Sequence, residues 1–90
     1  MKKIILDSKE FLTKDELHKV LKKKMNLPDY YGNNLDALWD CITGYIPLPM
    51  TVEWLNFNQS KANLGEYADM VLEVFEDAEQ ELDDFKIIIN

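Results

Sequence analysis

The sequence lacks arginine altogether and contains a single cysteine, Cys41. One thiol cannot form an internal disulfide, so we expect this protein in a reducing compartment, the cytoplasm. No apolar run approaches the roughly 18 residues that a membrane-spanning helix requires. The apolar run after the first lysines is also too short for a signal peptide. These absences predict a protein without a membrane partner.

Positive charge is scarce, because ten lysines stand against seventeen acidic residues and give a net charge of −7. This balance argues against nucleic acid as a partner and favours a basic protein, although solubility alone can also explain it. The charges are unevenly distributed: residues 1–24 hold eight lysines and four acids, whereas residues 66–84 hold nine acids and no lysine.

Signals for catalysis or metal binding are weak. The sequence has no phosphate-binding glycine loop and no zinc-ligand spacing. His18 is its only histidine and lies beside an apolar helical stripe, so we expect it at the edge of the surface. We expect Cys41 to be a small buried side chain. We therefore predict no cofactor, no metal and no enzymatic activity.

Periodicity and turn signals predict the order strand, helix, helix, strand, helix, helix, strand. The strands are expected at residues 3–7, 50–54 and 85–89, and the helices after the Thr13 capping box, after Asn33 or Asn34, within residues 56–63 and from Gly65. This order predicts a parallel three-stranded sheet in one α/β domain over residues 1–90. Polar Thr51 and Glu53 on the middle strand predict helices mainly on one face.

The second predicted helix has two contrasting stripes. Its apolar stripe, at i, i+3, i+4 and i+7, consists of Leu35, Leu38, Trp39 and Ile42. Asp36, Asp40 and Thr43 form a separate solvent-facing stripe. Carboxylates at i and i+4 repel by about 0.2–0.5 kcal/mol, and no lysine lies between residues 25 and 60 to relieve them. We expect Gly44 to end this helix in the left-handed conformation.

Aromatic residues surround these acids in the sequence: Tyr30, Tyr31, Trp39 and Tyr45. Aromatic rings supply large contact area at little conformational cost, and together with carboxylates they predict a site for a cationic group. The alternative is a hydrolase acid pair or a divalent metal site. Both require a cleft, which an exposed convex helix does not provide.

The last helix carries Asp69, Glu73 and Asp77 at i, i+4 and i+8. We expect its acidic field to accelerate association with a basic partner and to weaken in salt. Asp77 is the residue of this helix that we expect to contact the partner directly.

Residues 27–41 read Leu-Pro-x-Tyr-Tyr-Gly-x-Asn-Leu-Asp-Ala-Leu-Trp-Asp-Cys, which resembles the barstar family of intracellular ribonuclease inhibitors. Glu53-Trp54, Phe57 and Gln59-Ser60-Lys61 continue the resemblance, which extends from Lys3 to the C-terminus. It implies a barstar-like two-layer fold with about four helices mainly on one face of a three-stranded parallel sheet. It also implies a monomer that plugs a small basic ribonuclease in a 1:1 complex and protects the producing cell.

The resemblance further implies which residues contact the ribonuclease: Tyr30, Asn34, Asp36, Trp39, Asp40, Thr43 and Gly44 match interface positions. Asp40 would replace the scissile phosphate of RNA and meet the catalytic arginine and histidine groups of the enzyme. Tyr45 stands where the best-known member has tryptophan, Asp77 and Pro47 where it has glutamate, and Asp83 replaces its second cysteine. These departures affect the rim and leave open a different ribonuclease, or another basic toxin or nuclease, as the partner.

Overall fold

The computed structural model describes residues 2–90 and has the order of elements that periodicity predicts. The elements are β1 (Lys2–Asp7), the 3-10 turn η1 (Ser8–Glu10), α1 (Lys14–Lys24), α2 (Leu35–Gly44), β2 (Met50–Leu55), α3 (Phe57–Leu64), α4 (Glu66–Glu81) and β3 (Phe85–Ile89). No helix within residues 2–90 has the length and apolar character required to cross a membrane.

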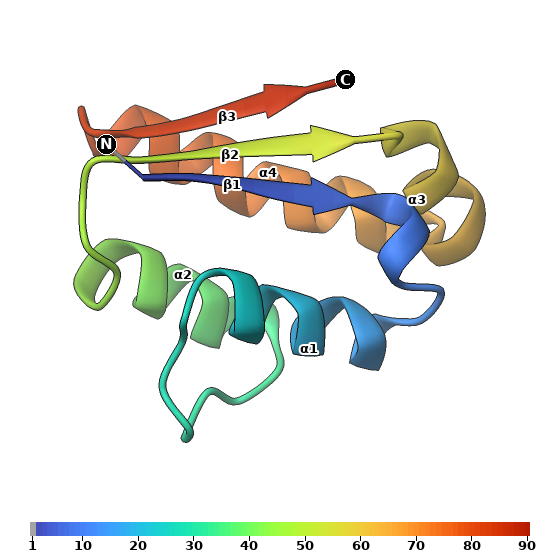
Figure 1. The fold of residues 1–90 in the computed structure, drawn as a ribbon, viewed down its shortest axis with the longest axis horizontal. Helices are drawn as coiled ribbons and strands as arrows, with labels where there is room; N and C mark the ends of the chain where they lie inside the picture. Colours follow the sequence, from blue (N-terminus) through green and yellow to red (C-terminus); the bar gives the residue numbers. More distant parts are fainter. Residues whose placement is uncertain (1) are drawn as a thin grey trace.

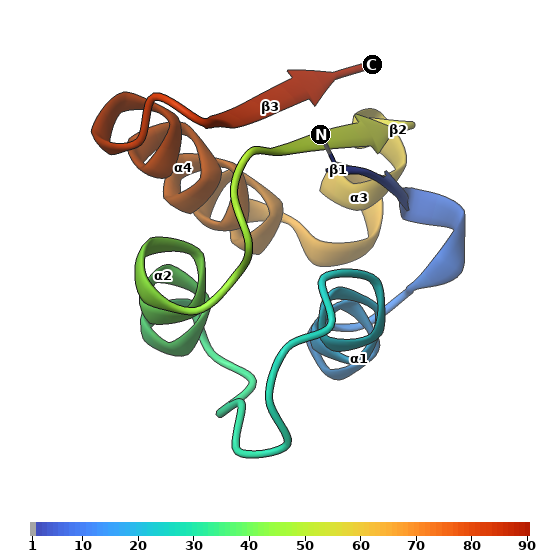
Figure 2. The ribbon, with the colours of Figure 1, turned by 60° about the vertical axis from the view of Figure 1, so that its left-hand side comes forward.

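The sheet is parallel throughout, with strand order β1-β2-β3. Side chains of the central strand alternate between its two faces, and Met50, Val52 and Trp54 are buried against the helices. On the opposite face, the Lys3 ammonium pairs with the Glu53 carboxylate at 2.8 Å. Figure 2 shows the strands along the top and the helices beneath them. The predicted two-layer arrangement, with helices on one face, is confirmed.

Each of the helices α2 and α4 buries one apolar stripe in the core. The buried positions of α2 are Leu38, Cys41 and Ile42, and those of α4 are Ala68, Val71, Phe75 and Ala78. The two helices also pack against each other. Because the inner stripes make the core, the outer faces of α2 and α4 remain exposed side by side.

A buried polar cluster ties η1, β2 and α3 together. The indole N–H of Trp54 donates to the hydroxyl oxygens of Ser8 and Ser60, at 3.0 and 3.2 Å. The Ser8 hydroxyl also bonds the Ser60 hydroxyl and donates to the Leu55 carbonyl at 3.0 Å. Trp54 is thus a core residue, as predicted, and its one polar atom is satisfied.

Candidate functional site

The outward stripe of α2 consists of Asp36, Asp40 and Thr43, and all three side chains are exposed. At 100° per residue they fall within a sector of about 60° around the helix axis. Trp39 borders this sector and is half-buried. The two predicted stripes of this helix are therefore present, with Leu38 and Ile42 facing the core.

The start of α2 is fixed by Asn34. Its Oδ1 accepts the backbone N–H of Ala37 at 2.7 Å, and its Nδ2 donates to the Gly32 carbonyl at 3.2 Å. Of the two predicted capping residues, Asn34 is the one used, because Asn33 lies in the left-handed region with φ of 55°. This cap places Asp36 in the first turn, where the helix dipole favours a carboxylate.

The end of α2 differs from the prediction. Gly44 is the last helical residue and does not have a positive φ, so the expected left-handed ending is wrong. The N–H groups of Tyr45 and Ile46 instead both donate to the Cys41 carbonyl, at 2.9 and 3.0 Å, which satisfies it without a left-handed residue. A Cβ added at Gly44 would meet no atom within 4 Å. The fold itself therefore does not require glycine here.

The predicted aromatic residues separate into exposed and buried groups. Tyr30 is 80% exposed and Tyr45 is 49% exposed, on the two sides of the α2 stripe in sequence. Tyr31, which we expected among them, is 6% exposed and belongs to the core. Its backbone N–H donates to the Pro28 carbonyl at 3.0 Å in a tight turn, and neighbouring side chains in such a turn point in different directions. Figure 1 shows this loop extending away from the sheet.

The acids of the stripe have no cationic partner within the described chain. The ion pairs among residues 2–90 are Lys3–Glu53, Lys24–Glu10 and Lys61–Asp69. None of them includes Asp36 or Asp40, so the repulsion between these carboxylates is not relieved within residues 2–90. We use the name acid–aromatic surface for the side chains of the α2 stripe, of its neighbour Trp39 and of the two exposed tyrosines that flank it in sequence: Tyr30, Asp36, Trp39, Asp40, Thr43 and Tyr45.

On α4 the predicted acidic row is shorter than its sequence pattern indicates. Glu73 and Asp77 are exposed and take part in none of the ion pairs of residues 2–90. Asp69, however, is bound by the Lys61 ammonium. The half-buried Glu79 accepts the Ile87 N–H at 3.0 Å and so covers a polar group of the edge strand β3. Asp77 is thus exposed and outside these ion pairs, whereas Asp69 has an internal partner.

His18 is the clearest error of the sequence-based prediction, because it is only 1% exposed. Its Nδ1 lies 2.7 Å from the Tyr31 hydroxyl and its Nε2 lies 2.7 Å from the Tyr67 hydroxyl. Burial lowers the pKa of His18, although Asp15 acts in the opposite direction. Burial also raises the pKa of Tyr31 and of Tyr67, which keeps both hydroxyls protonated. The tyrosines are 13 and 49 residues away in sequence, so no local pattern signals this cluster.

Two further observations concern the thiol and possible metal ligands. Cys41 is buried as predicted, and burial followed by the charge of Asp40 raises the pKa of its thiol. Within residues 2–90, no group of three histidine, cysteine or carboxylate side chains is arranged to hold a metal ion.

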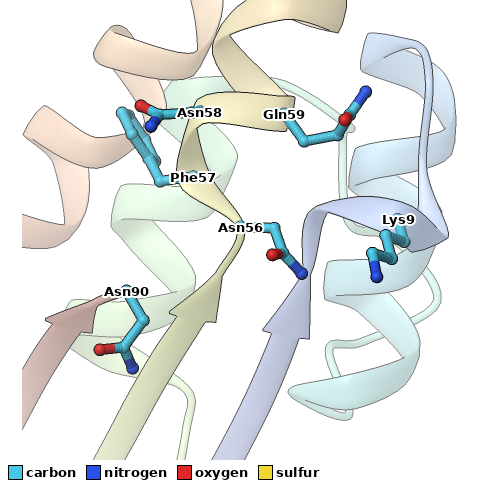
Figure 3. A pocket seen from close by; sticks show the side chains of 6 residues that line it. All are labelled: Lys9, Asn56, Phe57, Asn58, Gln59 and Asn90. Carbon is cyan, nitrogen blue, oxygen red and sulfur yellow. The ribbon is translucent and has the colours of Figure 1, made fainter.

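Two hollows lie away from the acid–aromatic surface. One, of about 350 Å³, lies where the strands end (Figure 3) and is lined by Lys9, Asn56, Phe57, Asn58, Gln59 and Asn90. Its polar groups are partly used internally, since the Asn56 amide donates to Asp7 at 3.0 Å. The other, of about 420 Å³, is lined by Glu10, Val20, Lys23 and Lys24. Neither includes Asp36 or Asp40, so these hollows do not supply the cleft that an acid pair in a hydrolase would need.

These features describe a small two-layer α/β protein that exposes carboxylates on one helix and aromatic rings beside them in sequence. The chain belongs to the barstar family, whose model, described as Barstar (barnase inhibitor), matches residues 1–90. A relative from Bacillus subtilis (strain 168), named "Putative ribonuclease inhibitor YrdF", is 56% identical over 90 residues, which cover 99% of this chain and 99% of the relative. The family resemblance seen in residues 27–41 is confirmed.

Proposed function

We propose that this protein inhibits a small basic ribonuclease of the barnase type in a 1:1 complex, without catalysing a reaction itself. In the proposed complex, α2 and the loop before it enter the active site of the enzyme, and the Asp40 carboxylate takes the place of the scissile phosphate. The observation that carries this proposal is the exposed pair Asp36 and Asp40, which has no cation partner among residues 2–90. Family membership supports the same conclusion.

The physical basis is charge complementarity. An enzyme that cleaves RNA must stabilise developing negative charge on a phosphate, so its active site presents preorganised cationic and hydrogen-bond-donating groups. A carboxylate accepts the same charge-assisted hydrogen bonds as a phosphate oxygen. Binding would also relieve the repulsion between the two stripe carboxylates. Because no ion pair among residues 2–90 involves these acids, they are available to the enzyme.

The remaining proposed contacts lie around this centre. Asn34 and Gly44 are at the two ends of α2, and Asp77 is on the neighbouring helix α4. The hydroxyl of Thr43 donates to the Trp39 carbonyl at 2.8 Å, which leaves its oxygen free to accept from a partner. Tyr30, Trp39 and Tyr45 supply the aromatic contact area. We propose that residues 1–90 act as one domain for this purpose, in the cytoplasm of the cell that makes the ribonuclease.

A second candidate is a different basic nuclease or toxin as the partner. It is favoured by the rim positions Tyr45, Pro47 and Asp77, which depart from the best-known family member. All three are exposed, so the departures would meet the partner directly. Rim residues tune partner choice more than they determine the binding mode.

The experiment is a titration of the protein into a barnase-type ribonuclease while RNA cleavage is followed. We expect activity to fall linearly to zero at one equivalent. A basic ribonuclease of an unrelated fold is the control. Non-specific charge attraction would inhibit both enzymes, whereas binding that depends on the shape of the active site would inhibit only the barnase-type enzyme. Full activity of the barnase-type enzyme at equimolar inhibitor would contradict this partner, and pull-down from the producing cell would then test the second candidate.

A further inference from the structure

Two adjacent tyrosines in the loop before α2 have opposite environments. Tyr30 is 80% exposed, whereas Tyr31 is 6% exposed and lies in the core. The same loop is held at Leu27, which is also buried and whose N–H donates to the Lys22 carbonyl at 2.9 Å. Pro28 is buried as well, whereas residues 29, 30 and 32–34 are exposed. The direction of Tyr30 therefore depends on how firmly its neighbour Tyr31 is held.

The hold on Tyr31 comes from α1. The Nδ1 atom of His18 lies 2.7 Å from the Tyr31 hydroxyl, and the two rings are 5.7 Å apart between centroids. His18 is fixed from its other side, where Nε2 lies 2.7 Å from the Tyr67 hydroxyl of α4. Both ring nitrogens are thus occupied, and the buried ring has no unpartnered polar atom.

We propose that His18 is a positioning residue for recognition: through its bond to Tyr31 it fixes the loop that presents Tyr30 to the partner. The inference rests on the proposed function, because it assumes that Tyr30 and the start of α2 contact the ribonuclease. A loop that is already ordered in its bound conformation loses less entropy on association, so this bond increases affinity without touching the partner.

The bond requires a particular protonation pattern. In the neutral ring one nitrogen donates to a tyrosine hydroxyl and the other accepts from a tyrosine hydroxyl. A protonated ring donates from both nitrogens, so one tyrosine loses its acceptor. The titratable and charged groups around the cluster are Asp15 on the same helix, Lys14 with its ammonium 4.6 Å from the centre of the Tyr67 ring, and Cys41 near Tyr31.

The test compares Tyr31→Phe with Tyr67→Phe in the full chain. Each variant removes one hydroxyl and one 2.7 Å bond to the same histidine, so each should lower the melting temperature by a similar amount. Only Tyr31→Phe frees the loop. We expect it to accelerate amide hydrogen exchange at residues 29–34 and to weaken binding to the barnase-type ribonuclease about tenfold, the effect of losing one hydrogen bond. We expect Tyr67→Phe to remain within about twofold of the parent in both measurements.

Equal changes in loop exchange and affinity in the two variants would show that His18 contributes only to the stability of the fold, and would overturn the proposal. Unchanged exchange at residues 29–34 in Tyr31→Phe would overturn it as well. The exchange measurement needs no ribonuclease, so it decides the positioning of the loop even where the parent protein inhibits nothing. Failure of the proposed function and failure of this inference are therefore distinguishable.

Discussion

Asp40 of α2 and Ser60 of α3 are both polar residues on helices, but their side chains lie in opposite environments. Asp40 is exposed, and none of the ion pairs or side-chain hydrogen bonds of residues 2–90 involves it. Ser60 is fully buried and bonds both Ser8 and the Trp54 indole. Removing a buried, partnered group leaves other groups unsatisfied, whereas removing an exposed, unpartnered one does not. A substitution at Asp40 should therefore affect binding, and a substitution at Ser60 should affect stability.

The largest effect is expected from Asp40→Ala. We expect it to weaken binding to the ribonuclease by more than about 2 kcal/mol, the level of an interface hot spot, and to change the free energy of unfolding by less than about 0.5 kcal/mol. Hot spots of this size are known for the barnase–barstar pair, whose inhibitor belongs to the same family, and the expected magnitude is taken from that pair. Calorimetric titration and chemical denaturation measure the two quantities.

Asp15→Ala is the matched control, because Asp15 is an exposed aspartate on α1 and its removal changes the net charge equally. It should leave affinity close to that of the parent. An Asp40→Ala variant that binds as tightly as the parent would refute the role of this carboxylate as a phosphate mimic.

Ser60→Ala should show the opposite pattern. The change removes a buried hydroxyl that accepts from Trp54 at 3.2 Å and bonds Ser8. We expect the free energy of unfolding to fall by about 1–2 kcal/mol, since the groups left behind keep only some of their partners. Inhibition by the folded variant should be unchanged. A loss of affinity at a temperature where the variant is fully folded would show that binding and stability are not separable in this molecule.

The pH dependence of the free energy of unfolding tests the role of the buried His18. The pKa of His18 is lowered in the folded protein, so between that value and the ordinary value of about 6.5 the unfolded chain binds more protons. The free energy of unfolding should therefore fall as the pH drops below about 6.5, by at most about 1.4 kcal/mol per pH unit. Asp7, whose pKa is lowered by the Lys9 N–H bond and then by the Asn56 amide, acts only near and below its ordinary value of 3.8.

Denaturation curves from pH 8 to pH 5 measure this slope. His18→Gln cannot titrate in that range, so its stability should be nearly independent of pH there. A slope that persists in the variant would assign the effect to another group.

Gly44→Ala should change both stability and binding, in opposite directions. An added Cβ meets no atom within 4 Å, and Gly44 has no positive φ. Alanine is the better helix former, so we expect the free energy of unfolding to rise by up to about 1 kcal/mol. We expect affinity to fall, because the new methyl group would stand between α2 and the ribonuclease. Parallel denaturation and binding measurements decide this, and an alanine variant with higher stability and unchanged affinity would exclude close approach at this residue.

Most of the fold could be predicted from the sequence because its signals are local. The 3.6-residue period of α2, the alternation in β2 and the capping box of α1 each depend on residues within one element. The acid stripe was predicted for the same reason, since Asp36 and Asp40 share a face by helix geometry alone.

Features that depend on distant partners were not predictable in this way. The burial of His18 depends on two tyrosine partners from other elements. A local pattern does not reveal such partners, so it places His18 at the surface. Residue chemistry alone could not choose between the adjacent tyrosines; the family resemblance points to Tyr30 as the contact residue, and in the structure Tyr31 is the one that is buried. Likewise, Asn33 and Asn34 can both cap a helix, and the choice rests on the backbone conformation of the loop.

The smallest effects are expected on α4, where Glu73 and Asp77 separate long-range attraction from contact. Glu73→Gln should slow association with the ribonuclease about twofold at low salt, leave dissociation unchanged, and have no effect in high salt, because it only weakens the acidic field. Asp77→Asn should slow association equally, and should also accelerate dissociation where this carboxylate touches the enzyme. Stopped-flow measurements at two salt concentrations resolve both rates. Identical kinetics in the two variants would mean that α4 only steers, and that docking belongs to the acid–aromatic surface alone.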